Sequence, residues 1–198
     1  MGVKVAHVEA GLRTYDLTRP FPEEGLRQMI TRITALNFAP TQGAANALFQ
    51  EGIPPEIVYL TGNTVIDAQK WIIDHHQIHA KASNKKQILV TMHRRENWGN
   101  EIEQACKAIA HLASKYDELE FLFPVHLNPT VKDQVFPILG NLQNVHLTEP
   151  LDYLDMQQAL ANSWLVLTDS GGIQEEAPTF GLPVLVLRKE TERPEAVN

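Results

Sequence analysis

Residues Leu165 to Leu187 read LVLTDSGGIQEEAPTFGLPVLVL, and this stretch decides the fold of the chain. Two apolar runs, of the kind that forms strands buried on both faces of a parallel sheet, bracket a Gly-Gly turn and a short polar segment. Gly181 and Pro183 are typical of the point where a helix ends. The stretch therefore predicts strand, turn, helix and strand, the repeating unit of a parallel α/β sheet.

The turn of this stretch, Ser170-Gly171-Gly172, has two interpretations. Residues without Cβ let the backbone approach a ligand closely, and the unpaired N–H groups at a helix N-terminus attract phosphate. The simpler interpretation is that Ser170 only caps the helix, while Glu175 and Glu176 favour its dipole. From this stretch alone, we weigh an anion site and a simple cap equally.

Composition excludes several classes of protein. The 198 residues are 43% hydrophobic, enough to bury a core in one or two domains, and the net charge of −7 argues against nucleic acid as the main partner. No apolar run approaches the roughly 20 residues that span a bilayer, and no signal segment opens the chain, so we expect a cytoplasmic protein without a membrane partner. The single cysteine, Cys106, excludes internal disulfides and is expected in a helix core.

Metal binding is not expected. His75, His76 and His79 lie close together, but only the first and last have the spacing that faces them on a helix, and no acidic residue is built in between as in HExxH. We therefore interpret them as the solvated end of a helix, whose dipole a cationic imidazole complements.

Strands and helices alternate along the whole sequence, which predicts a doubly wound parallel sheet. The polar, lysine-rich segment 80–86 is the candidate linker, so we predict two domains, 1–80 and 81–198. Before it we expect strands at 3–8, 37–39 and 57–60 and helices at 23–36, 44–49 and from Thr64, its N-cap, onward. After it we expect strands at 87–92, 119–125, 145–147, 165–167 and 184–187 and helices at 102–112, 131–138, 154–161 and after Ser170.

Four polar residues follow predicted strands by one to three positions: Glu9, His93, His126 and Ser170. The carboxyl ends of parallel strands share one edge, where open α/β sheets bind ligands, and two domains facing each other there would form a cleft. Taken singly, His126 is explained as a histidine near the core. Four such residues at equivalent places favour a ligand site.

The residue types at this edge suit a diphosphate. Arg13, Arg94 and the Ser170-Gly171 turn could hold it, and His93 could donate to it or to the bond that breaks. Glu9 and Glu23 then remain as acid and base, because two carboxylates in one cleft can raise each other's proton affinity.

A series of motifs runs in order across nearly the entire chain: HVEAGLR at 7–13, PEE at 22–24, TGNT at 61–64, HRREN at 93–97, PVHLNP at 124–129, DSGGIQEEAP at 169–178 and TERPE at 191–195. Together they resemble the non-hydrolysing UDP-N-acetylglucosamine 2-epimerases, and the series is far more specific than any one motif.

The resemblance implies a GT-B fold, with two Rossmann-like domains and the UDP-sugar between them. It also implies that UDP-GlcNAc loses its C2 proton and its UDP to give 2-acetamidoglucal, to which UDP returns after protonation of the other face, yielding UDP-ManNAc. Neither a metal nor a nicotinamide cofactor is required by this chemistry. In bacterial members a second UDP-GlcNAc acts as an allosteric activator, and we expect a homodimer at full length.

The resemblance also implies roles for residues at matching positions. Glu9 and Glu23 match the family's acid and base carboxylates, and His93 matches its catalytic histidine beside the diphosphate. Substrate-binding positions are the phosphate turn Ser170 and Gly171, the ribose carboxylate Glu176, and Arg193 near the sugar or diphosphate.

The chain departs from the family at both ends. Relatives carry a GTRPE-like motif and a catalytic aspartate upstream of Met1, and they continue past Asn198. We therefore expect an incomplete first domain, a second domain truncated at its end, and no turnover by this chain alone. The alternatives are a non-catalytic UDP-binding module and a GT-B glycosyltransferase, and the paired Glu9 and Glu23 motifs rank the transferase last.

Overall fold

The computed structural model describes residues 2–92 and 100–187. Its internal contacts divide the chain into two compact units, with the boundary between Asp67 and Ala68, inside helix α3 (Thr64–His76). The predicted domain boundary at residues 80 and 81 falls after this helix. Each unit is parallel α/β, as the alternation of strands and helices predicted.

The first unit holds a three-stranded parallel sheet in the order β1-β2-β3. Its elements are β1 (Ala6–Val8), α1 (Glu23–Ile33), β2 (Leu36–Ala39), α2 (Gln42–Gln50), the 3-10 helix η1 (Pro55–Ile57) and β3 (Val58–Leu60). The sequence predicts that helix α1 extends to Leu36, but it ends at Ile33. Thr34 is extended, and its hydroxyl donates back to the Thr31 carbonyl at 3.2 Å. The predicted N-cap Thr64 is instead the first helical residue, and Asn63 accepts the Val65 N–H at 3.0 Å.

A small core of residues following β1 and lining α2 lies inside the first unit: Ala10, Leu12, Ala39, Ala44, Ala45, Leu48 and Ile53. Gly11, at a φ of +87°, makes this packing possible, because a Cβ at this position would overlap the carbonyl oxygen of Ala44. The chain leaving β1 thus touches the backbone of α2 directly.

Helix α1 presents its apolar stripe outward. Leu26, Met29 and Ile33 are 52%, 62% and 74% exposed. Its buried residues are polar, Glu24 at 0% and Thr31 at 1% exposed. Most amphipathic helices bury the apolar side. The buried side of α1 instead accepts hydrogen bonds, at Glu24 from the Thr14 N–H and at Thr31 from Arg13.

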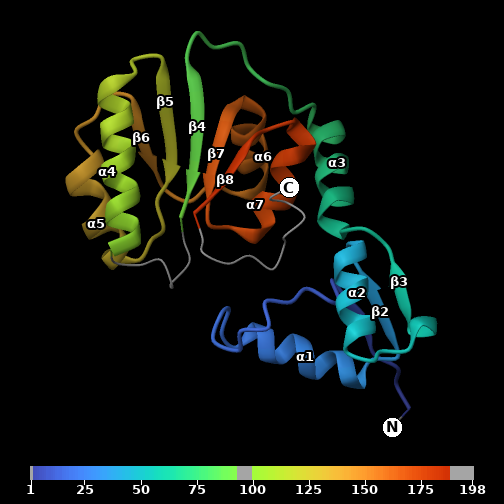
Figure 1. Cartoon of the computed structure of the whole chain (residues 1–198). Coiled ribbons are helices and arrows are strands. Elements are labelled where there is room, and N and C mark those ends of the chain that lie inside the picture. Colours follow the sequence, from blue (N-terminus) through green and yellow to red (C-terminus); the bar gives the residue numbers. More distant parts are fainter. Residues whose placement is uncertain (1, 93–99, 188–198) are drawn as a thin grey trace. The chain divides into compact units, whose positions relative to one another are not determined.

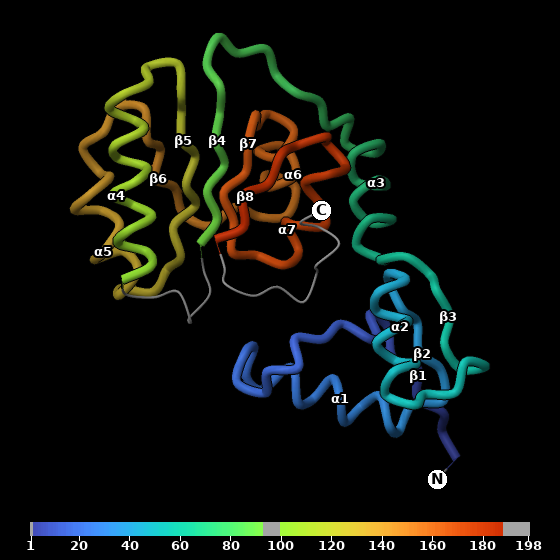
Figure 2. The backbone as a smooth tube through the Cα atoms, in the orientation of Figure 1, coloured from blue at the N-terminus to red at the C-terminus, as the bar shows by residue number. Residues whose placement is uncertain are grey.

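The second unit holds a five-stranded parallel sheet in the order β6-β5-β4-β7-β8 (Figure 1). Figure 2 traces the chain from β4 through α4 to β5, which pairs with β4 in parallel. Strand β4 pairs with β5 on one side and with β7 on the other, so the strand order reverses between β4 and β7. This position is the topological switch point of a doubly wound sheet. Its elements are β4 (Lys86–Thr91), α4 (Asn100–Lys115), β5 (Leu119–Pro124), α5 (Pro129–Leu139), β6 (Val145–Thr148), α6 (Tyr153–Asn162), β7 (Ser163–Thr168), α7 (Gly171–Glu176), the 3-10 helix η3 (Ala177–Phe180) and β8 (Val184–Val186).

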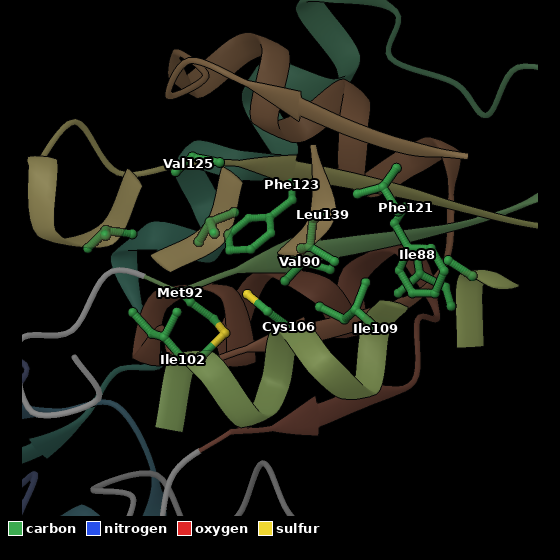
Figure 3. Close-up of a cluster of buried hydrophobic side chains, with 14 of the residues drawn as sticks. Ile88, Val90, Met92, Ile102, Cys106, Ile109, Phe121, Phe123, Val125 and Leu139 are labelled. Carbon is green, nitrogen blue, oxygen red and sulfur yellow. The ribbon is translucent and has the colours of Figure 1, made fainter. Parts of the chain in front are cut away.

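Apolar clusters cover both faces of this sheet. Ile88 and Val90 of β4 point to α4 and α5, and Figure 3 shows them with Cys106, Phe121 and Phe123. Leu89, between them in sequence, belongs to the cluster formed with α6 and α7 on the other face. The prediction that Cys106 is a core residue on a helix is confirmed, since it is 0% exposed on α4.

In the parts of the chain that the structure describes, no helix has the length and apolarity that crossing a bilayer requires. Within residues 2–92 and 100–187, no group of histidine, cysteine, aspartate and glutamate side chains is arranged to hold a metal ion. Trp71 and His75 stack at the end of α3, with ring centroids 4.6 Å apart.

Candidate functional site

The candidate site lies in the second unit, at the carboxyl ends of the two central strands, β4 and β7. The Oγ1 atoms of Thr91 and Thr168, the last residues of these strands, are hydrogen-bonded at 2.6 Å. The Asp169 N–H then donates to the Thr91 carbonyl at 3.1 Å, and the Ser170 N–H donates to Thr168 Oγ1 at 2.9 Å. These bonds fix the direction in which the chain leaves the sheet.

The turn that follows leads directly into helix α7. Ser170 is its N-cap, and the Ser170 Oγ accepts the Ile173 N–H at 3.5 Å. A Cβ on Gly172 would lie 3.8 Å from that hydroxyl oxygen and 3.7 Å from Glu176 Oε1. The capping interpretation of Ser170 is therefore confirmed, and the Ser170 hydroxyl and Glu176 Oε1 both lie near the same side of Gly172. Phosphate binding at Ser170 and Gly171 stays a prediction.

Glu176, at the end of α7, is a buried carboxylate with 6% exposure. The Gln157 Nε2 donates to its Oε2, and the Tyr153 hydroxyl also bonds to this carboxylate. Burial raises the pKa of Glu176, and the two hydrogen bonds oppose that rise by stabilising the charged form. Burial, together with the nearby charge of Glu176 and the hydrogen bond to it, raises the pKa of Tyr153 to about 12.

His126 follows β5, which pairs with β4, so it lies at the same edge of the sheet as Ser170. Its side chain is exposed, and its Nδ1 accepts the Asn128 N–H at 3.1 Å. Asn128 in turn caps α5 by accepting the Thr130 N–H at 2.8 Å. The placement fits the predicted edge, and a role toward substrate stays a prediction.

The two predicted acid and base residues belong to the first unit. Glu9 follows β1, is half-buried, and has a φ of +59°, an uncommon backbone conformation for a residue with a side chain. Glu23 begins α1 and is exposed, whereas its neighbour Glu24 is buried and accepts the Thr14 N–H at 3.0 Å. Sequence reasoning passed over Glu24, which holds the loop before α1 in place.

Arg13, predicted to contact a diphosphate, is buried in the first unit and bonded to other side chains there. Its side chain is only 2% exposed and pairs with Glu51 through two bonds, of 2.6 and 3.0 Å. Two further bonds go to the Leu12 carbonyl and to the Thr31 hydroxyl, both at 3.0 Å. These partners use most of the guanidinium donors. The contact of Arg13 with a diphosphate stays a prediction.

Three predicted residues, His93, Arg94 and Arg193, lie outside the residues that the structure describes. Their predicted roles beside the diphosphate and sugar stay predictions.

Sequence reasoning missed the side chains that surround Glu176, namely Tyr153, Gln157 and Gln69. Gln69 and Gln157 are each 0% exposed, although glutamine is ordinarily a surface residue. The available signal was helical spacing. Tyr153, Gln157 and Leu160 are four and three residues apart, so they lie on one face of α6. A glutamine on the same face as a buried leucine is expected to be buried too.

Comparison with known proteins identifies the family of this chain. A family model described as UDP-N-acetylglucosamine 2-epimerase matches residues 1–198, and the chain belongs to this family. The UDP-N-acetylglucosamine 2-epimerase of Salmonella typhimurium is 47% identical over 208 residues, covering 99% of this chain and 55% of that protein. The chain spans about half the length of the curated relatives it matches.

Solved structures give the same result. The UDP-GlcNAc 2-epimerase of Neisseria meningitidis bound to UDP-GlcNAc matches with a TM-score of 0.92 and 45% identity, covering 98% of this chain and 56% of that one. The Methanocaldococcus jannaschii enzyme in complex with UDP-GlcNAc and UDP matches with a TM-score of 0.81 and 34% identity, covering 98% and 56%. The predicted family and the α/β, GT-B-like fold class are thereby confirmed.

Proposed function

We propose that the whole protein interconverts UDP-GlcNAc and UDP-ManNAc, and that residues 68–187 form its uridine-diphosphate site. The observation that carries this proposal is the arrangement at the switch point of the second sheet, where Ser170 caps the glycine-rich start of α7 and Glu176 stands at the end of the same short helix. A phosphate at the Ser170 turn and a ribose at Glu176 suit, respectively, a helix N-terminus and a carboxylate acceptor. Relatives crystallised with UDP-GlcNAc and with UDP support the same ligand class.

The proposed reaction removes the C2 proton while the bond between C1 and the UDP oxygen breaks, which leaves 2-acetamidoglucal and UDP in the site. UDP then adds back to C1 as a proton returns to C2 from the opposite face. Glu9 and Glu23 are proposed as the acid and base for these proton transfers, and His93 as the partner of the departing diphosphate. His126, Arg94 and Arg193 are proposed as substrate contacts.

No cofactor enters this chemistry, because the carbon that is deprotonated is not oxidised in the net reaction. A second UDP-GlcNAc as activator, a homodimer of the whole protein and a cytoplasmic place of action belong to the same proposal, on the support of the sequence resemblance. Because the chain spans about half the length of its curated relatives, we propose that these 198 residues alone bind UDP without epimerising the sugar.

Calorimetry with UDP tests the binding site. In Ser170→Asp, a carboxylate would face the diphosphate, so UDP affinity should fall at least about tenfold through repulsion of like charges. The matched control is Ser83→Asp, which places the same charge on an exposed residue far from Ser170 in the sequence. This variant should leave UDP affinity unchanged. Equal UDP binding by both variants and the unsubstituted chain would disprove the phosphate site.

Turnover tests the rest of the proposal. The purified chain is incubated with UDP-GlcNAc in D₂O, and UDP-ManNAc and deuterium at C2 are measured by NMR. We expect UDP binding without deuterium incorporation. Sustained exchange at C2 would confirm epimerase chemistry while showing that the matched half is sufficient for it.

A further inference from the structure

We propose that Gln157, oriented by Gln69, is a positioning residue that aims the Glu176 carboxylate at the ribose hydroxyls of a bound uridine nucleotide. This inference deepens the proposed function and rests on it, because Glu176 meets a ribose only if UDP binds at the Ser170 turn. Neither glutamine touches the proposed reaction centre, so both act through Glu176.

Gln157 fixes one oxygen of the carboxylate. Its Nε2 donates to Glu176 Oε2 from the neighbouring helix α6, and the contact is buried. The other oxygen, Oε1, lies on the side of Gly172, where a Cβ would be 3.7 Å from Oε1 and 3.8 Å from the Ser170 hydroxyl oxygen. With Oε2 engaged by Gln157 and the Tyr153 hydroxyl also bonded to the carboxylate, the group is fixed in orientation, and we assign Oε1, on the side of Gly172, as the acceptor for ribose.

Gln69 decides which end of the Gln157 amide faces Glu176. The Gln69 Nε2 donates to Gln157 Oε1 at 2.8 Å, so the Gln157 carbonyl end is already engaged and its N–H₂ end points to the carboxylate. The same Gln69 nitrogen donates to the Glu176 main-chain carbonyl at 3.0 Å. The Gln69 side chain of α3 thus holds both the Gln157 amide and the main chain of Glu176.

This arrangement is costly to the fold, which argues for a role beyond packing. Both glutamines are 0% exposed, and Gln69 Oε1 has no hydrogen-bond partner among the described residues. An unpaired buried amide oxygen destabilises the fold, because it has given up its hydrogen bonds to water without replacing them. The adjoining residues Leu160 and Ile173 belong to an apolar cluster, where a methionine of similar volume would pack at a lower desolvation cost.

Calorimetry with UDP and with 2′,3′-dideoxyuridine 5′-diphosphate separates positioning from folding. The unsubstituted chain should bind UDP about tenfold more tightly, since only UDP offers hydroxyls to Glu176. Gln157→Met should lose that preference, through weaker UDP binding and unchanged dideoxy binding. Gln69→Met, which leaves Gln157 present but free to turn, should reduce the preference about threefold. Gln158→Met, the next residue on α6 and partly exposed, is the control that should keep it.

Each outcome decides a different question. UDP binding with full hydroxyl preference in both Gln157→Met and Gln69→Met would overturn the positioning role alone. No UDP binding by the unsubstituted chain would overturn the proposed function and this inference with it. Should Gln157→Met not fold, as judged by thermal unfolding, Gln69→Met carries the test, and an intact hydroxyl preference in that variant would refute the positioning role.

Discussion

The two units of the chain are both parallel α/β, yet their interiors are held together differently. In the second unit, apolar clusters fill both faces of the sheet, with Phe121 and Phe123 completely buried. In the first, a small cluster lies against α2, while Glu24 and Thr31 of α1 accept hydrogen bonds from the Thr14 N–H and from Arg13, whose guanidinium also pairs with Glu51. The difference teaches that the same topology can rest on apolar area in one unit and on hydrogen bonds in the other.

The largest expected effect is a loss of stability when a phenylalanine is truncated, compared between one phenylalanine of each unit. Phe121→Ala should lower the free energy of unfolding of the second unit by about 4 kcal/mol, because it empties a fully buried site. Phe49→Ala, at a residue that is 40% exposed in the first unit, should cost less than about 1 kcal/mol. Urea unfolding followed by circular dichroism measures both. Similar losses would mean that the first unit depends on apolar packing as much as the second.

The ion pairs of the two units provide the next test. Arg13→Met leaves Glu51 without its partner in a buried setting and should destabilise the first unit by about 3 kcal/mol, with little dependence on salt. Lys107→Met removes an exposed pair with Glu103 on α4 of the second unit and should change stability by less than about 0.5 kcal/mol. Unfolding at low and high NaCl compares them, and a small, salt-sensitive effect at Arg13 would contradict the polar attachment of α1.

The smallest effect is a pH dependence confined to the first unit. Burial, together with the charges of Arg13 and Arg27, lowers the pKa of His7 in β1 below its usual value of 6.5. Protonation therefore favours the unfolded chain, and stability present above pH 6.5 should be lost as the pH falls toward the lower folded pKa. Unfolding midpoints from pH 7 to about pH 5 should fall less steeply in His7→Gln. An unchanged slope in that variant would assign the acid sensitivity to other groups.

Much of the second unit could be predicted from local sequence signals. The alternation of β-branched runs with helical spacing placed every strand from Lys86 to Val186, and Ser170 and Gly181 marked the beginning and end of the helical segment between β7 and β8. These signals work because strand burial on both faces and helix capping are decided by residues that are close in sequence.

Contacts between residues far apart in sequence could not be predicted in this way. Arg13 pairs with Glu51, 38 residues away, and Gln69 bonds to Glu176, 107 residues away. The apolar stripe of α1 correctly indicated a helix, but the polar residues between its members are the ones that face the unit. Periodicity identifies a helix with two unlike faces, and only the surrounding tertiary structure decides which face is inside.

The one-sided pairing of β1 has a consequence for handling this protein in solution. Among the described strands of its sheet, β1 is bonded only to β2. Val8 at the end of β1 is 53% exposed, and Val3, ahead of the strand, is 86% exposed. An unpaired strand edge is a template for other chains, which a net charge of −7 opposes by mutual repulsion. Added salt shortens the reach of that repulsion to below about 10 Å above 0.1 M, so preparations should stay dispersed longest in dilute buffer and turn cloudy as ionic strength rises.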